Sequence, residues 1–229
     1  MTPEEKIVKK ANEFFDLVDN YLIKDLNTMI IEIKPRESGG GVGYPAIHSV
    51  VSGMELMGLI LSGKQDDAAF NVFWNDYLEK EFPEYKKTGL KDIFRKVIRH
   101  GTAHYFLVKA GISISKNNMN HLQNIDGFLN IDLKVLFSHF LKCYQLIKED
   151  ILNKKTKLDN FDKGFNELSK QMVFAQSTVR NFLGDNSSSE SGFSDHSIKT
   201  VSGGASGACF DVPKTDPPDH WLNNKQGLK

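Results

Sequence analysis

Cysteine is scarce in this chain, which has two cysteines among its 229 residues. Cys143 and Cys209 stand in unrelated surroundings, so the sequence contains neither a disulfide framework nor a zinc knuckle. The first ten residues, MTPEEKIVKK, lack the apolar core of a signal peptide, and no apolar run approaches the ~20 residues that span a bilayer. We therefore expect a cytoplasmic, reduced protein with no membrane partner.

The chain also lacks net charge, because 29 Lys and Arg balance 29 Asp and Glu. The overall charge therefore does not indicate a nucleic-acid-binding protein. The local charge is positive between residues 86 and 109, where seven basic residues accompany a single acid. We predict that this stretch attracts a polyanion such as RNA, and a solvated helix face is the alternative explanation. The predicted RNA-binding cations are Lys91, Arg95, Lys96 and Lys109.

Apolar residues at helical spacing predict an all-α protein, an up-and-down helical bundle of one good core. Thr2-Pro3-Glu4-Glu5 has the residues of a capping box with proline at the first helical position. Asp66 or Asp67 is expected to cap the third helix, and Asp132 a later one. The expected helices cover about residues 3–33, 45–61, 66–81, 90 onward, 133–152 and 158–183.

Short alternating runs around Asp126-Gly127 interrupt this helical pattern and predict a small β-hairpin or extended loop over about residues 112–131. We divide the chain into a bundle of residues 1–155, an amphipathic helix of residues 156–184 that packs on the bundle or on a partner, and a tail of residues 185–229. The tail is rich in Ser, Gly, Pro, Asp and Asn, so we expect it to be disordered or loosely attached.

The sequence contains incomplete motifs for two other kinds of site, a phosphate-binding loop and a zinc site. The glycines of residues 38–44, SGGGVGY, are not followed by the Lys-Ser/Thr pair of a phosphate-binding loop. His100 and His104 have the i, i+4 spacing of a zinc pair, but Gly101 stands where a metalloprotease needs glutamate, and no third ligand stands out nearby. We therefore expect no metal and no other cofactor.

The stretch RHGTAH, residues 99–104, joins a permanently charged guanidinium to an imidazole that titrates near neutrality. Arg99 can hold a phosphate bidentately, while His104 can give or take the proton of a ribose hydroxyl or of the leaving oxygen. On a straight α-helix these two residues lie about 140° apart. They meet only through a distortion near Gly101, through a wrapped arginine, or across two chains.

These six residues resemble the motif of the HEPN superfamily, in which an arginine, a polar residue and three variable residues precede a histidine. Tyr105-Phe106 and Lys109 follow the motif, as in uncharacterised bacterial HEPN-like proteins. The resemblance covers about the first two thirds of the chain, in keeping with the size of one domain. It implies an all-helical and often metal-independent ribonuclease whose active cleft is built from two protomers, hence a homodimer.

The resemblance also implies roles for the motif residues. Arg99 binds and polarises the scissile phosphate, and His104 is the general base or acid of an attack by the ribose 2′-hydroxyl. His100 orients the site or shares proton transfer, while Tyr105 and the nearby cations contact RNA. A toxin–antitoxin or phage-defence setting, with an antitoxin or other protein partner, follows from the same likeness. The alternative is a non-catalytic helical module that binds RNA or a partner protein.

Overall fold

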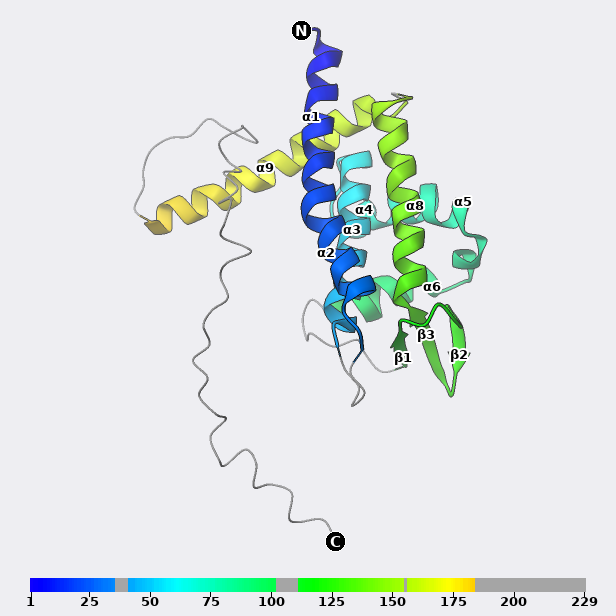
Figure 1. Cartoon of the computed structure of the whole chain (residues 1–229). Coiled ribbons are helices and arrows are strands. Elements are labelled where there is room, and N and C mark those ends of the chain that lie inside the picture. Colours follow the sequence, from blue (N-terminus) through cyan, green and yellow to red (C-terminus); the bar gives the residue numbers. More distant parts are fainter. Residues whose placement is uncertain (36–40, 102–110, 155, 184–229) are drawn as a thin grey trace. The chain divides into compact units, whose positions relative to one another are not determined.

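The computed structural model describes residues 1–35, 41–101, 111–154 and 156–183 of the chain. Residues Met1–Gln171 form one compact unit and Met172–Lys229 another. The tail of residues 185–229 and the predicted site residues His104, Tyr105 and Lys109 lie outside the described residues. Within them the fold is mainly helical, with one small sheet (Figure 1).

Four helical segments form the N-terminal rod, which follows the predicted first helix closely. Thr2 caps it as expected, since its side chain accepts a hydrogen bond from the Glu5 amide while the Glu5 carboxylate accepts one from the Thr2 amide. Two of the segments are π-helical, a wider winding in which an amide bonds the carbonyl five residues earlier. The segments are α1 (Pro3–Leu17), η1 (Val18–Ile23), α2 (Lys24–Asn27) and η2 (Thr28–Glu32).

Helix α3 (Gly43–Ser62) lies at the centre of the bundle, in contact with α4, α8 and η5. Gly58 allows the closest approach, because an added Cβ would overlap the Ala69 carbonyl. By length and composition α3 is long and apolar enough to cross a membrane, yet 61% of that window is buried inside the protein. Such burial is typical of the core helix of a globular bundle.

The third predicted helix is present, but its predicted cap is wrong. Gln65 occupies the N-cap position, and no side chain caps this end. The carboxylates of Asp66 and Asp67 instead approach the arginines of the motif helix. This part of the chain comprises α4 (Asp66–Phe73), π-helical η3 (Trp74–Leu78), α5 (Glu79–Glu81), 3-10 helix η4 (Pro83–Lys86), α6 (Leu90–Asp92) and π-helical η5 (Ile93–Arg99).

The predicted hairpin is real but is part of a three-stranded sheet of order β1-β3-β2. Strands β2 (Gln123–Ile125) and β3 (Phe128–Asp132) pair antiparallel around Asp126 and Gly127, both of which have positive φ. Strand β1 (Ile112–Ser115) pairs parallel to β3. Hydroxyls from β1 bind polar side chains of β3, which fixes this register: Ser113 Oγ lies 3.0 Å from Asn130 Oδ1, and Ser115 Oγ lies 3.0 Å from Asp132 Oδ2.

Two long helices complete the described chain, with the bounds that the sequence predicts. Helix α8 (Leu133–Leu152) begins at its Asp132 cap, whose Oδ1 accepts hydrogen bonds from the Lys134 and Val135 amides. Helix α9 (Leu158–Leu183) buries Phe161 and Phe165 near its start, whereas Phe174 and Phe182 further along are largely exposed. Among the described residues of α9, the buried apolar side chains therefore lie in its first turns.

Candidate functional site

Arg99 ends the π-helical segment η5, so the motif begins where the backbone winding changes. The His100 amide donates to the Arg95 carbonyl, five residues earlier, in the π-helical pattern. The residues that lead into the motif are therefore wound as a π-helix and not as a straight α-helix. Segments of π-helix are frequent at functional sites because they redirect side chains without breaking the helix.

The guanidinium of Arg99 is held by Glu55 of α3 in a two-point pair. Arg99 Nε lies 2.6 Å from Glu55 Oε2, and Nη2 lies 2.6 Å from Oε1. The two side chains are only 21% and 19% exposed, so water screens the pair weakly. Asp66 adds a longer contact, 3.8 Å from Nη2. Charge-assisted pairs with two parallel hydrogen bonds fix the orientation of the guanidinium plane.

A cavity of about 250 Å³ opens beside Glu55 and Asp66, which both contact Arg99. It is bounded by the second half of α3, the start of α4 and the middle of α9. Its lining is mixed, with Ser52, Glu55, Gln65, Asp66 and Gln171 as the polar members and Leu56, Leu59, Ala69 and Leu168 as the apolar ones.

The other cations of the motif helix have acidic or polar partners as well. Arg95 lies 3.1 Å from Asp67 and 3.2 Å from Asp92, and its side chain is only 20% exposed. Arg95 and Arg99 therefore both turn toward acids of neighbouring elements. Lys96 pairs with Asp92 at 3.6 Å, and Lys91 donates to the Asn75 amide oxygen.

A cluster that the sequence did not predict connects Tyr85 of η4 to two histidines. The Tyr85 hydroxyl lies 2.9 Å from His121 Nε2 and 3.1 Å from His139 Nδ1. His121 Nδ1 accepts the Asp132 amide proton, so the ring is neutral and its proton sits on Nε2, facing Tyr85. Tyr85 then donates to His139, whose Nε2 lies 3.9 Å from Glu84. The hydrogen bonds therefore define one consistent order of donors and acceptors.

The environment of this cluster lowers the pKa of both imidazoles. Burial, followed by the repulsion of His139, lowers the pKa of His121 to about 4, and burial lowers the pKa of His139. The nearby charges oppose one another, because Asp132 favours a charged His121 while Lys87 disfavours it. The cluster thus joins η4, the loop before β2 and α8 through neutral rings.

Acidification is expected to destabilise the protein through His121. The unfolded imidazole binds a proton below about pH 6.5 and the folded one only near pH 4, so stability falls as the pH falls through this window and then levels off. The shift corresponds to about 3 kcal/mol. Urea unfolding between pH 7 and 4 measures the loss, and His121→Gln is expected to remove most of its pH dependence. Equal pH dependence in both proteins contradicts this assignment.

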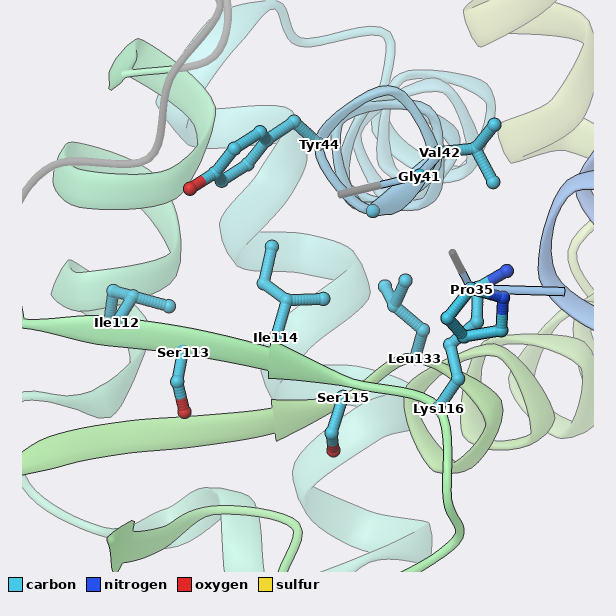
Figure 2. A pocket seen from close by; sticks show the side chains of 11 residues that line it. Pro35, Gly41, Val42, Tyr44, Ile112, Ser113, Ile114, Ser115, Lys116 and Leu133 are labelled. Carbon is cyan, nitrogen blue, oxygen red and sulfur yellow. The ribbon is translucent and has the colours of Figure 1, made fainter. Parts of the chain in front are cut away.

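A second hollow, of about 380 Å³, lies between β1 and the start of α3 (Figure 2). Figure 2 shows Ile112 and Ile114 pointing toward α3, and Ser113 and Ser115 pointing away. Lys116 is the cation among the described residues of its lining, and it donates to the Met29 and Ile33 carbonyl oxygens at the end of η2. Among the described residues, none of the predicted site residues lines this hollow.

Of the predicted catalytic residues, the structure places Arg99 and His100 at the end of η5, and His104 lies outside the described chain. The residue that sequence reasoning missed is Glu55, whose only signal was a single acid within an apolar helix. In the part of the chain that the structure describes, no group of three or more His, Cys, Asp or Glu is arranged to hold a metal ion. Comparisons with protein-family models, curated proteins and solved structures gave no match.

Proposed function

We propose that this chain is a metal-independent endoribonuclease of HEPN type that cleaves RNA by attack of a ribose 2′-hydroxyl. The observation that supports it most is the RHGTAH motif of residues 99–104, whose first residue, Arg99, is held in a fixed orientation by Glu55. Preorganised charge of this kind stabilises a transition state because no reorientation is needed when charge develops on the phosphate.

In the proposed reaction the 2′-hydroxyl oxygen forms a bond to phosphorus, and the bond from phosphorus to the 5′-oxygen breaks. The proton of the 2′-hydroxyl leaves to a base, and the departing 5′-oxygen takes a proton from an acid. His104 is the general base or acid, Arg99 stabilises the charge on the phosphoryl oxygens, and His100 orients the site or shares proton transfer. The products are a 2′,3′-cyclic phosphate and a 5′-hydroxyl.

Three further parts of the proposal follow from the motif's likeness to HEPN ribonucleases. The cleft is formed by a homodimer, so that motifs of two protomers face one RNA. Arg95, Lys96, Lys91, Lys109 and Tyr105 bind the RNA backbone and bases around it. The setting is a toxin–antitoxin or phage-defence system in the cytoplasm, in which an antitoxin or other protein partner controls the activity.

Purified protein incubated with total RNA in EDTA tests this function directly. Cleavage is expected to continue in the chelator and to leave fragments with 2′,3′-cyclic phosphate ends, which are detected because a phosphatase alone does not remove them. His104→Ala protein, with unchanged circular dichroism and oligomeric state, serves as the control. Intact RNA after incubation with folded wild-type protein, or equal cleavage by the control, contradicts the proposal.

A specific observation favours the non-catalytic helical module as the second candidate. Each cation of the motif helix described here, from Lys91 to Arg99, contacts an acid or a polar side chain, which reduces its attraction for a polyanion. In that case the Arg99–Glu55 pair joins two helices and does no chemistry. Binding of a single-stranded RNA without turnover distinguishes this candidate from the enzyme.

A further inference from the structure

Helix α9 carries one apolar stripe along its length. The members of the stripe recur at alternating intervals of four and three residues, the heptad spacing of a helix that packs along another helix. A repeat of seven residues keeps the stripe facing a single partner helix over several turns. The members are Phe161, Phe165, Leu168, Met172, Ala175, Val179 and Phe182.

The first part of this stripe, within the unit of residues Met1–Gln171, packs on the helical bundle. Phe161 is fully buried, and its ring centroid lies 5.9 Å from that of Phe14 in α1. Gly164 lies so close to α3 that an added Cβ would be 2.3 Å from the Ile60 carbonyl oxygen. The stripe therefore already serves as a helix-packing surface over its first turns.

The second part of the stripe, in the unit that begins at Met172, is exposed. Five of the twelve large apolar side chains that are exposed in the described chain lie between Met172 and Phe182, and Phe182 is 88% exposed. Exposed apolar side chains gathered on one segment mark an interaction surface, because their contact with water is unfavourable. The heptad spacing continues unchanged into this part, which indicates that its partner is also a helix.

Two features favour a second copy of this chain as that partner. From residue 171 to residue 183 the sequence contains a single charged residue, Arg180, so two identical segments can pair with little repulsion between like charges. No other stretch of similar length in the described chain has more than two exposed large apolar residues. A two-fold contact pairs one surface with itself, and among the described surfaces this one therefore fits best.

We propose that α9 pairs with α9 of a second copy across the exposed part of its stripe, as a two-stranded coiled coil. Each stripe then covers the other, so that Met172, Ala175, Val179 and Phe182 leave water in both chains. The exposed part is about 18 Å long, so the dimer is expected to dissociate at micromolar concentrations. The proposal uses no residue of the RHGTAH motif and does not depend on the proposed function.

Analytical ultracentrifugation of the full chain tests this contact. Wild-type protein is expected to dimerise, and Val179→Glu is expected to raise the Kd of the dimer at least about 10²-fold, because each dimer would then bury two carboxylates. Phe174→Glu is the matched control, since it makes a similar change on the side of α9 away from the stripe and is expected to leave the Kd unchanged. Wild-type protein that stays monomeric, an unchanged Kd in Val179→Glu, or an equal loss in both variants overturns the proposal.

Hydrogen exchange of the wild-type protein provides a second measurement, which needs no variant. The amides of residues 172–183 are expected to exchange more slowly as the protein concentration rises, because pairing protects them. Helix α8 serves as the internal reference, and its protection is expected to stay constant. Protection of residues 172–183 that does not change with concentration would show that the same chain covers this surface, and it would overturn the second copy as the partner.

Discussion

Under the proposed nuclease function, replacing Arg99 by methionine is expected to lower the rate of RNA cleavage at least about 10³-fold, which corresponds to about 4 kcal/mol of transition-state stabilisation. Glu55→Met is expected to have an effect of similar size, although Glu55 touches no substrate. The carboxylate fixes two of the nitrogens of Arg99, and without it the guanidinium loses the orientation that the phosphate needs. Single-turnover cleavage of a labelled RNA measures both losses.

Measurements of stability distinguish the proposed role of Glu55, which is to orient Arg99, from a merely structural role. Each single substitution leaves a half-buried charge without its partner and is expected to lower the free energy of unfolding by about 2–3 kcal/mol, less than for a fully buried pair because each side chain is about one fifth exposed. The double variant Arg99→Met, Glu55→Met removes both charges and is expected to regain most of that stability. It is not expected to regain cleavage.

Arg99→Lys is the matched control for charge. It keeps the positive charge but cannot form two parallel hydrogen bonds with one carboxylate, so cleavage is expected to fall about 10²-fold. Full activity in Glu55→Met protein would show that the ion pair only joins α3 to η5. A cleavage rate that follows stability through all four proteins points to the same structural role.

The sequence predicts the long helices well because their signals are local. The apolar period of residues 133–152 and the aspartate before them are enough to define α8 and its cap, and an apolar period likewise predicts α9. The Asp126-Gly127 turn is another short-range signal, and the hairpin around it is present. Elements whose stability is determined by neighbours along the chain are therefore predictable.

Features that depend on distant residues were not predicted. Glu55 lies 44 positions before Arg99, and nothing near either residue indicates that they pair. Asp66 and Asp67 have the composition of a helix cap, but the arginines of η5 attract their carboxylates elsewhere. The Tyr85 cluster likewise joins three segments, since Tyr85 lies 36 and 54 residues before the two histidines that it contacts. The pairing of polar groups across the bundle depends on tertiary packing. The periodicity of the sequence carries no information about that packing.

The largest loss of stability is expected from Asp132→Ala. Asp132 is fully buried, and its two oxygens accept hydrogen bonds from four backbone amides and one hydroxyl. Oδ1 caps α8, and Oδ2 binds the Asn117 and Asn118 amides and the Ser115 hydroxyl, so one carboxylate joins the sheet, the loop after β1 and a core helix. Removing it leaves these five partly buried donors without their acceptor, at a cost of about 4–5 kcal/mol.

Asp132→Asn is the matched variant, because it keeps the shape and one acceptor oxygen. That oxygen can still cap α8, whereas the new NH₂ group faces the amides of Asn117 and Asn118, which are themselves donors. Its cost is expected to be about 2 kcal/mol. Urea unfolding ranks the three proteins, and hydrogen exchange locates the loss in Asp132→Asn at residues 115–118, with α8 still protected. Hydrogen exchange that rises equally at residues 115–118 and in α8 would contradict the separate roles of the two Asp132 oxygens. An Asp132→Ala variant as stable as wild type would contradict them as well.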